Sequence, residues 1–468
     1  MLSYNLAQEK GPLYKTLYKF IREDIQNGKL KANEKMPSKR ALAKNLGIST
    51  ISIENAYEQL ISEGYLYSVP KSGYFVCEIE NIRKLSLPKA NEKNHAAQEN
   101  NQEKSENLFD FSSNQIEKSN FPFSVWAKLL RETISTRENN LLEVSPCGGV
   151  KELQAAIANH LENFRGMSVN PHQIIVGAGT EYLYGLLIKL LGSEKTYCIE
   201  NPGYRKLQQI YESNNVKCIP VDMDEKGLSV KELRKSSAQI AHISPTHHFP
   251  TGIFMPVSRR YEILTWASED ENHYVIEDDY DSEFRLKGKP APSLYSMDVF
   301  GKIIYLNTFS KSLTSTIRIS YMILPEKLAE LFYKKLSFYS CTVSTFEQYT
   351  LSSFISQGYF EKHINRMRLH YGKRRNQVME IIRTRFKEDQ CKIIENESGL
   401  HFILQFNTKL SDQQVKKRLR EKGIIISSIT DFYMTPCRQN LHQFILNYSN
   451  INVRELDSAL EKIKTILF

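Results

Sequence analysis

From about residue 108 onward, short β-rich apolar runs alternate with longer helical runs. The strand-like runs are "QIIVGAG", "TYCIE", "AQIAHIS", "HYVIEDD" and "KIIYLNT", and helical stretches such as "TEYLYGLLIKLLG" lie between them. Strands that alternate with longer helices predict an α/β fold with a mostly parallel sheet covered by helices. Ligands of such sheets bind at the carboxyl ends of the strands. The residues that directly follow these runs are therefore the candidate site residues.

A polar and charged segment at residues 81–107 divides the chain. It reads "NIRKLSLPKANEKNHAAQENNQEKSEN" and has almost no aromatic side chains. Such a composition cannot bury enough apolar surface to fold alone. We expect a flexible linker at 81–107, a short unit at 1–80 before it and a large unit at 108–468 after it.

The unit before the linker has the order helix, helix, short turn, helix and hairpin. Ser38 is expected to cap the second helix, and Ser49 or Thr50 the third. The pattern predicts a helix-turn-helix followed by a β-hairpin whose tip carries Lys71 and Gly73. Hydroxyls at the start of a recognition helix can contact phosphates and base edges, and the tip can lie along a DNA backbone. The pattern alone also fits a small protein-interaction module.

The composition excludes some classes of protein. Apolar residues make up 41% of the chain and charged residues 25%, as in ordinary soluble globular proteins. No apolar run is long enough to span a bilayer, and the start lacks the layout of a secretory signal. The seven cysteines are scattered without close pairs, which favours reduced thiols in the cytoplasm. The formal charge of +9 is compatible with a polyanionic partner.

The first candidate site follows "QIIVGAG". Gly177 and Gly179 allow close approach of the backbone, and Thr180 and Glu181 begin a helix whose free N–H groups favour a phosphate. A purely structural glycine turn is the alternative.

The second candidate site is the acidic cluster "VIEDDYDSEF". Asp278 can stabilise a protonated heteroaromatic nitrogen, with the hydroxyl of Tyr280 donating to a neighbouring oxygen. A metal site or a solvated acidic turn is the alternative here.

The third candidate is "TFSKSLTSTIR", which we expect to leave a strand and enter a loop. A desolvated Lys311 can form a Schiff base, Thr308 and Ser310 offer hydroxyls, and Arg318 can bind a phosphate by two parallel hydrogen bonds. A surface lysine is the alternative for Lys311.

Two further strand ends carry aromatic or imidazole side chains. Tyr204, in "ENPGYRKL", could stack on a flat ring, and His247 and His248, in "ISPTHHFPTG", could hydrogen bond to a ring substituent. A packed tyrosine and structural histidines are the alternatives.

Residues 12–77 resemble the winged helix of the GntR family of bacterial repressors. The matching text is "PLYKTLYKFIREDIQNGKL", "MPSKRALAKNLGIST", "ENAYEQLISEGYL" and "SGYFV". The resemblance implies DNA contacts from Ser38, Arg40, Ser49, Thr50, Ser52 and Gly73. The family usually has arginine where this chain has Thr50, so direct reading of a guanine is not expected there.

Residues 108–468 resemble the fold-type I, aspartate-aminotransferase-like proteins that bind pyridoxal 5′-phosphate (PLP). The resemblance implies a large domain with a mostly parallel sheet and flanking helices, and a smaller C-terminal α+β subdomain. It implies a Schiff base at Lys311, Asp278 at the pyridine nitrogen, Tyr280 at the phenolic oxygen and Tyr204 on the ring. The phosphate would be surrounded by Gly179, Thr180, Glu181, Thr308 and Arg318. Phe249 stands where the aminotransferases have asparagine, which makes His248 the candidate for that role.

The two resemblances in this order are typical of the MocR/GabR family of transcription factors. Members use PLP chemistry to sense a ligand and form swapped, head-to-tail homodimers, which implies an operator with two half-sites. The motifs "VGAGTEY", "EDDYDSEF" and "TFSKSL" look especially close to GabR, the regulator of γ-aminobutyrate use. The resemblance therefore implies a PLP-dependent regulator. An aminotransferase with an autoregulatory winged helix, or a winged helix joined to an inactive PLP site, is the alternative.

The effector of this chain is expected to differ from γ-aminobutyrate. In GabR, arginines hold the carboxylate of the effector, and the matching positions here are Lys206, beside Arg205, and Asp431. An acid at position 431 would repel a carboxylate, and would instead meet a second amine or be solvated. Another amino compound, or PLP itself, is expected as the signal.

Overall fold

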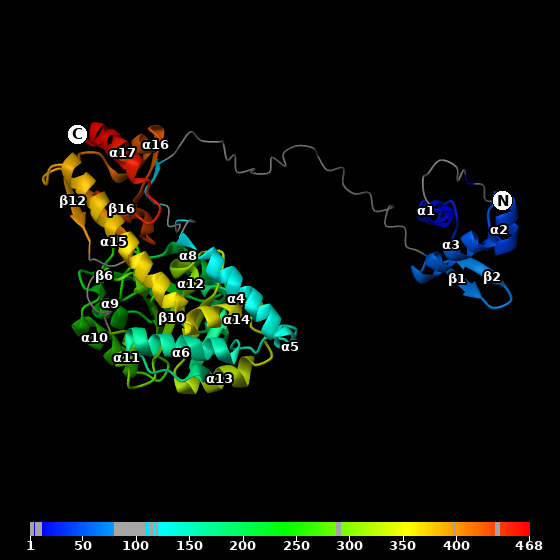
Figure 1. Cartoon of the computed structure of the whole chain (residues 1–468), viewed down its shortest axis with the longest axis horizontal. Coiled ribbons are helices and arrows are strands. Elements are labelled where there is room, and N and C mark those ends of the chain that lie inside the picture. Colours follow the sequence, from blue (N-terminus) through cyan, green and yellow to red (C-terminus); the bar gives the residue numbers. More distant parts are fainter. Residues whose placement is uncertain are drawn as a thin grey trace. The chain divides into compact units, whose positions relative to one another are not determined.

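The chain forms two compact units, Met1–Glu103 and Lys104–Phe468 (Figure 1). This computed structural model describes residues 4, 12–78, 109–112, 117, 120–286, 292–395, 399–435 and 440–468. The linker expected at 81–107 lies outside the described residues.

The smaller unit is a three-helix module with a hairpin. Its elements are α1 (Leu13–Gln26), α2 (Lys39–Leu46), α3 (Thr50–Ser62), β1 (Leu66–Val69) and β2 (Gly73–Val76), the last two antiparallel. Ser38 Oγ accepts the backbone N–H of Ala41 and caps α2. Ser49 Oγ does the same for Ser52 at 3.2 Å, so Ser49 rather than Thr50 is the cap of α3. These caps fix where α3, the expected recognition helix, begins.

The larger unit is built around an eight-stranded sheet with the order β4-β11-β10-β9-β8-β5-β6-β7. The strands β10, β9, β8, β5 and β6 run parallel to one another. Strand β11 is antiparallel to both β10 and β4, so β4 points the same way as β10. The strands are β4 (Ile174–Gly177), β5 (Tyr197–Asn201), β6 (Cys218–Asp224), β7 (Gly227–Leu228), β8 (Ile240–Ile243), β9 (Tyr274–Asp278), β10 (Ile303–Thr308) and β11 (Ser320–Ile323).

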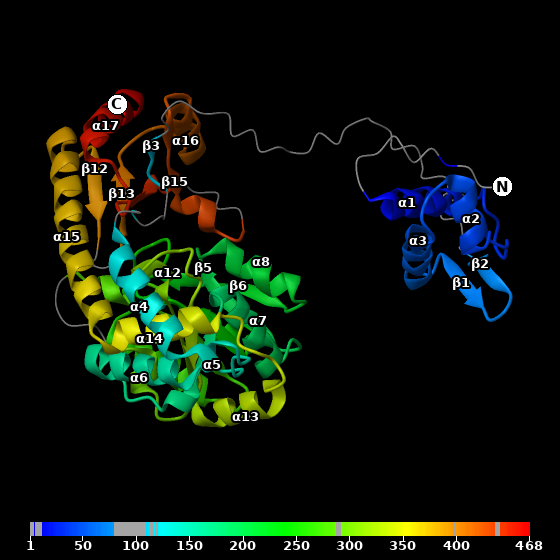
Figure 2. The ribbon, with the colours of Figure 1, turned by 45° about the vertical axis from the view of Figure 1, so that its right-hand side comes forward.

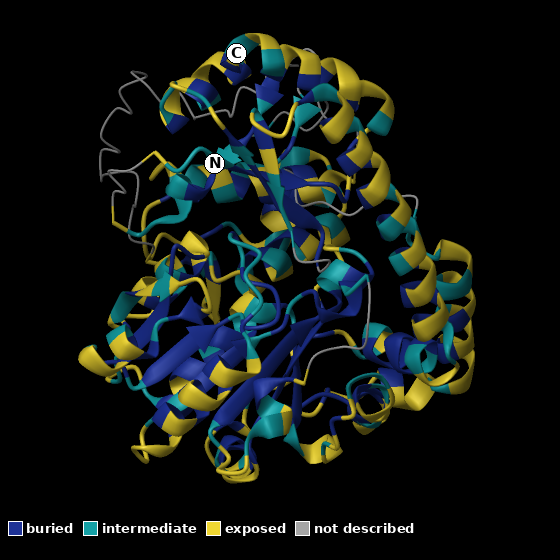
Figure 3. Ribbon diagram, turned by 90° about the vertical axis from the view of Figure 1, so that its left-hand side faces the viewer, coloured by how far each residue is buried: buried dark blue, intermediate teal, exposed yellow. Residues whose placement is uncertain are grey.

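Helices cover both faces of this sheet, because alternate strand residues are apolar on opposite faces. Ile304 of β10 packs in one apolar cluster with α7 and α13, whereas Ile303 packs in another with α10. Figure 3 shows the strands buried and the outer sides of the helices exposed. The helices are α4 (Phe123–Thr136), α5 (Glu138–Leu141), α6 (Lys151–Arg165), α7 (Thr180–Leu191), α8 (Arg205–Ser213), α9 (Val230–Lys235), α10 (Val257–Ser268), α11 (Leu294–Met297), α12 (Phe309–Ser312), α13 (Glu326–Leu336) and α14 (Thr345–Ser356), with short 3₁₀ turns η4 (Pro171–Gln173) and η5 (Ser282–Phe284).

A smaller α+β domain completes the larger unit. Its antiparallel sheet has the order β12-β13-β16-β15, and β14 pairs in parallel with β3. Figure 2 shows α15 running from the large sheet to this domain. The elements are β3 (Phe109–Asp110), α15 (Tyr359–Arg385), β12 (Cys391–Ile394), β13 (His401–Phe406), α16 (Asp412–Glu421), β14 (Ile424–Ile425), β15 (Ser427–Ser428), η6 (Ile429–Phe432), β16 (Gln443–Asn447) and α17 (Val453–Leu467).

The stretch after β10 differs from the loop that the sequence predicts. Thr308 ends β10, and its Oγ1 accepts the N–H of Ser310 at 3.1 Å, which starts the short helix α12. The strand therefore passes directly into the turn of helix that carries Lys311. In the described part of the chain, no helix combines the length and apolarity needed to cross a bilayer.

Candidate cofactor site and DNA-binding surface

Most of the predicted site residues lie at one edge of the large sheet. Because β4, β5, β8, β9 and β10 are parallel, their carboxyl ends meet at the same edge. The residues at or just after these ends are Gly179, Thr180 and Glu181 (β4), Tyr204 (β5), His247 and His248 (β8), Asp278 and Tyr280 (β9), and Thr308, Ser310 and Lys311 (β10).

Lys311 lies on α12 and is partly buried. His363 of α15 hydrogen bonds to the carbonyl oxygen of Ser312 at 2.8 Å and holds the end of α12 in place. Burial lowers the pKa of the Lys311 amine to about 8, and the nearby carboxylate of Asp281 only partly opposes this shift. Lys311 therefore has a larger neutral fraction than an exposed lysine, and the neutral amine is the form that attacks an aldehyde.

This pKa predicts how capture of PLP by the cofactor-free chain depends on pH. Below pH 8 the Lys311 amine is mostly protonated, so the rate should rise about tenfold per pH unit and level off above about pH 8. Stopped-flow absorbance after mixing with PLP measures this rate. A rate that continues to rise toward the ordinary lysine pKa would contradict the burial of Lys311.

Asp278 has one carboxylate oxygen held by the protein and one without a protein partner. Its Oδ2 accepts the hydroxyl of Tyr184 at 2.8 Å, and the Nε2 of His242 lies 3.5 Å from the same oxygen. The Nδ1 of His242 in turn lies 2.7 Å from the hydroxyl oxygen of Tyr211. Within the described residues, the buried Oδ1 of Asp278 has no hydrogen-bond partner. A protonated ring nitrogen would satisfy this oxygen, so the residues fit a pyridine cofactor.

Tyr184 is a support for Asp278 that the sequence did not reveal, and its removal should weaken PLP binding. A hydrogen bond to a charged group contributes about 1.5–3 kcal/mol, so Tyr184→Phe should raise the PLP dissociation constant about tenfold or more. Tyr182→Phe, on the same helix but without a contact to Asp278, is the control. Titration of each cofactor-free variant with PLP, followed by absorbance, measures the two dissociation constants. Equal affinities would mean that Tyr184 does not support the cofactor.

The other members of the acidic cluster also have defined partners. Glu277 accepts the N–H groups of Leu294 and Tyr295 at 2.9 and 3.0 Å. Asp279 pairs with Arg165 at 2.5 Å, with both side chains almost completely buried. Asp281 lies 2.7 Å from His247 Nδ1. Because these carboxylates are buried and individually bonded, the alternative of a solvated acidic turn is wrong.

Residues expected around a phosphate come together at the start of α7. Gly179 has a φ of 91°, and a Cβ at this position would lie 2.5 Å from Arg318 Nη2. Arg318 Nη2 is 3.5 Å from Glu181 Oε2, and Lys206 forms an ion pair with the same carboxylate, which lowers the pKa of Glu181. The N-terminus of α7 and the half-exposed Arg318 make this corner a fit for a phosphate dianion.

The hydroxyls of Thr308 and Ser310 take different positions at this edge. Thr308 Oγ1 is buried and accepts the hydroxyl of Ser320 at 2.8 Å. Ser310 is partly buried, and its backbone N–H donates a hydrogen bond to Thr308 Oγ1. Thr308 therefore has a structural role at the strand–helix junction in addition to the predicted phosphate contact.

The side chains expected at the cofactor ring differ in exposure. Tyr204 is half exposed at the start of α8, whereas Tyr280 is partly buried and its hydroxyl donates to the carbonyl oxygen of His247 at 3.1 Å. His248 Nδ1 lies 2.7 Å from Thr251 Oγ1, and its Nε2 is 3.5 Å from Glu200. The predicted contact of His248 with a ring substituent would therefore have to displace one of these partners.

The residues expected at the effector have partners inside the protein. Lys206 pairs with Glu181, and Arg205 Nη1 donates to the carbonyl oxygen of Asp431 at 3.4 Å. The carboxylate of Asp431 pairs with Lys416 and accepts the N–H of Ser428 at 2.9 Å. The carboxylate of Asp431 therefore has two partners at the start of η6, and its side chain remains 35% exposed.

In the smaller unit, the predicted DNA contacts gather at the helix starts and the hairpin. Ser38, Arg40, Ser49 and Thr50 are exposed at or next to the starts of α2 and α3, and Ser52 Oγ lies 3.0 Å from Ser49 Oγ. Lys71 and Gly73 form the hairpin turn with φ angles of 62° and 114°. These residues form the candidate DNA-binding surface.

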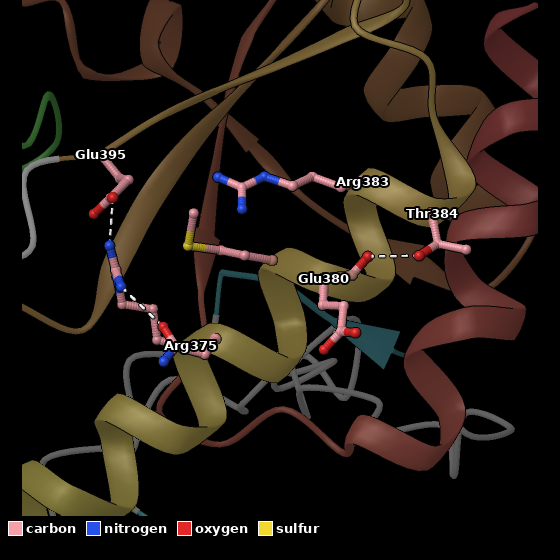
Figure 4. Close-up of a pocket in the computed structure, with 7 residues that line it drawn as sticks. Arg375, Glu380, Arg383, Thr384 and Glu395 are labelled. Carbon is pink, nitrogen blue, oxygen red and sulfur yellow. Dashed lines mark hydrogen bonds and ion pairs between the residues drawn. The ribbon is translucent and has the colours of Figure 1, made fainter.

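A separate cavity of about 550 Å³ lies in the smaller domain of the larger unit. Figure 4 shows Arg375 of α15 joined to Glu395, which follows β12, with Arg383 further along the helix. The cavity shares no lining residue with the strand-end site. Its ion pair ties α15 to the end of β12.

A buried lysine after a central strand, a carboxylate for a pyridine nitrogen and a phosphate corner define a PLP-binding domain of the aminotransferase type, and the same chain carries a winged helix. Residues 106–463 match the family "Aminotransferase class I and II", and residues 13–76 match "Bacterial regulatory proteins, gntR family".

Known proteins with the same layout cover nearly the whole chain. It is 33% identical over 455 residues to the uncharacterized HTH-type transcriptional regulator YdeL of Bacillus subtilis (strain 168), covering 97% of this chain and 96% of the relative. It is 29% identical over 466 residues to the probable rhizopine catabolism regulatory protein MocR of Rhizobium meliloti, covering 97% of this chain and 93% of the relative. The chain therefore belongs to the MocR-type family of DNA-binding transcriptional regulators, in which a GntR-type winged helix precedes an aminotransferase-like domain whose cofactor is PLP.

Solved structures agree with the fold of the larger unit. The kynurenine aminotransferase of Pyrococcus horikoshii superposes with a TM-score of 0.68 at 23% identity, covering 77% of this chain and 92% of that chain. At this identity the match supports the fold alone.

Proposed function

We propose that this regulator senses an amino compound, or PLP itself, through Lys311 and changes its binding to DNA in response. The observation that carries the proposal is the partly buried Lys311 near Asp281, at the same sheet edge as Asp278, whose Oδ1 has no hydrogen-bond partner among the described residues, in a chain that also has a winged helix. A reactive lysine in a protein that binds DNA is better explained by detection than by turnover alone.

The residues around Lys311 have separate tasks in this proposal. When bound, PLP supplies an aldehyde that condenses reversibly with primary amines. Asp278 holds the ring nitrogen protonated, and Arg318 with the start of α7 holds the phosphate. Asp281 and His401 would lie near the Lys311 amine once a ligand amine had taken its place. This replacement changes the DNA-binding state only if the ligand has different affinities for the two states of the protein.

The proposal includes a homodimer, arranged head-to-tail with exchanged winged helices, that acts in the cytoplasm on an operator with two half-sites. Several large apolar side chains of the larger unit are exposed, and they support self-association. They are Phe123 at the start of α4, Leu142 and Val144 after α5, and Phe338 after α13. Two winged helices per dimer would require two half-sites.

An electrophoretic mobility shift with DNA from upstream of the chain's own gene tests the proposal. The full chain, loaded with PLP, is titrated against this DNA with and without a panel of amines and with added PLP. A change in DNA affinity or footprint with at least one of them is expected. No change with any of them would mean that the chain is not a sensor of this kind.

Aminotransferase activity is the second candidate function. The low pKa of the released Lys311 favours it, because a neutral amine can also move a proton during transamination. Steady turnover with an amino donor and a keto acid would support an enzyme. Amine exchange without release of a keto acid would support a sensor.

A further inference from the structure

Four aromatic side chains form a continuous wall beside the candidate cofactor site. They are Tyr204, Phe249, Phe432 and His401, which we call the aromatic wall. Phe249 is central: its ring lies 5.1 Å from Phe432, 5.4 Å from His401 and 6.3 Å from Tyr204, each in an edge-to-face arrangement. Behind them, Ile403, Ile429 and Ile445 form a buried apolar cluster. The wall is therefore a preformed surface with an apolar backing.

The aromatic wall reaches Lys311 through His401 and His247. The rings of His401 and His247 are 4.5 Å apart, and His247 Nδ1 lies 2.7 Å from Asp281. Lys311 is close enough to both Asp281 and His401 to interact with them electrostatically. A molecule that replaces the Lys311 amine would therefore extend its substituent along this wall.

The charges near the aromatic wall do not suit a carboxylate. Lys206 and Arg205 are bonded to Glu181 and to the carbonyl oxygen of Asp431, respectively. Burial lowers the pKa of His248 to about 3 and lowers the pKa of His401 well below its ordinary value, so both rings are neutral at pH 7. A carboxylate placed against the wall would lose its hydration without gaining an unengaged cation from Lys206, Arg205, His248 or His401.

We propose that the effector is a primary amine that carries an aromatic or similarly flat apolar group and no carboxylate. This inference rests on the proposed function, and it specifies the class of ligand. The ring packs against the exposed edges of Tyr204, Phe249 and Phe432, where aromatic contacts add to the burial of apolar area.

The exchange at Lys311 needs no further reactant. The neutral ligand amine would form the new C=N bond as the C=N bond to Lys311 Nζ breaks, and, with both imines protonated, one proton would pass from the ligand nitrogen to Nζ. Nothing is oxidised or reduced, and Lys311 leaves as a primary amine.

Titration of the full PLP-loaded chain with matched amines tests the inference. The probes are 2-phenylethylamine, phenylalanine (the same ring with a carboxylate), n-butylamine (no ring) and γ-aminobutyrate, and the readout is the absorbance change on amine exchange. 2-Phenylethylamine should reach half-saturation at a concentration about tenfold lower than any of the others. Mobility shifts with the same probes should follow the same order.

Two variants localise the preference to the aromatic wall. Phe432→Ala should remove most of the advantage of 2-phenylethylamine over n-butylamine, whereas Phe300→Ala, which removes an exposed ring away from the wall, should leave it unchanged. Phe249→Leu is the substitute test if Phe432→Ala does not fold. It keeps an apolar side chain but removes the central ring of the wall, so it should lose the same advantage.

The outcomes separate the inference from the proposed function. If all amines exchange equally well, or if phenylalanine or γ-aminobutyrate binds best, the inference is overturned and amine sensing stands. If no amine changes the absorbance of a chain that holds PLP, amine sensing itself is wrong and the inference fails with it.

Discussion

Alanine in place of Lys311 is expected to abolish covalent capture of PLP and, with it, any response of DNA binding to amines. No other residue that we assign to the carboxyl edge of the large sheet offers a primary amine next to Asp281, so the chain has no substitute for Nζ. Borohydride reduction followed by peptide mapping measures the loss of the covalent label. Mobility shifts measured in parallel should show the same DNA binding with and without amine.

The matched control is Lys334→Ala, which removes an exposed lysine from α13. It should retain both the label at Lys311 and the response to amines. A label that persists in Lys311→Ala at another lysine, together with a normal response, would show that we have assigned the wrong nucleophile.

Asparagine in place of Asp279 is expected to cause the largest loss of stability among single substitutions near the site. Asp279 forms a buried ion pair with Arg165 and accepts the hydroxyl of Tyr305 at 2.8 Å. Removing one partner of a buried ion pair leaves the other charge without compensation, which costs about 3–5 kcal/mol in the free energy of unfolding. Urea unfolding followed by tryptophan fluorescence is suitable, because both tryptophans, Trp126 and Trp266, belong to the larger unit.

Glu269→Gln provides the comparison, because Glu269 pairs with Arg234 on the surface, where both side chains remain exposed. Its effect should be far smaller, because water screens exposed ion pairs. If Asp279→Asn and Glu269→Gln shift the urea midpoint equally, the Arg165–Asp279 pair does not carry the stability that its burial predicts.

The sequence was a good guide where structure depends on neighbouring residues. The strand-like runs become β4, β5, β8, β9 and β10, because β-rich apolar runs next to helical stretches determine both the strands and their direction. Ser38 and Ser49 cap their helices because a hydroxyl can reach the N–H groups of the first turn. The direction of the strands then brings Asp278 and Lys311 to one edge, where the motifs that carry the resemblance to PLP-binding proteins come together.

Contacts between segments that are far apart in the chain could not be predicted from the sequence. Tyr184 lies in an apolar helix, where nothing distinguishes its hydroxyl from a packed ring until it is placed next to Asp278. The Arg165–Asp279 pair joins α6 to the end of β9, across 114 positions of the chain. Asp431 was considered as an effector contact, and in the structure its carboxylate accepts the N–H of Ser428, the N-cap of η6. Such pairings follow from tertiary packing, which no local pattern encodes.

The aromatic wall takes two of its four side chains from the smaller domain, and this has an evolutionary consequence. Phe432 and His401 belong to the smaller domain, whereas Tyr204 and Phe249 follow β5 and β8, and the residues proposed to hold PLP also lie on or next to strands of the large sheet. If the proposed sensing holds, mutations at Phe432 and His401 can alter the detected amine without touching the residues proposed to hold PLP, so a duplicated gene can acquire a new effector through a few side chains. Overall sequence identity is consequently a poor guide to what a relative responds to, and the residues at these few positions are a better one.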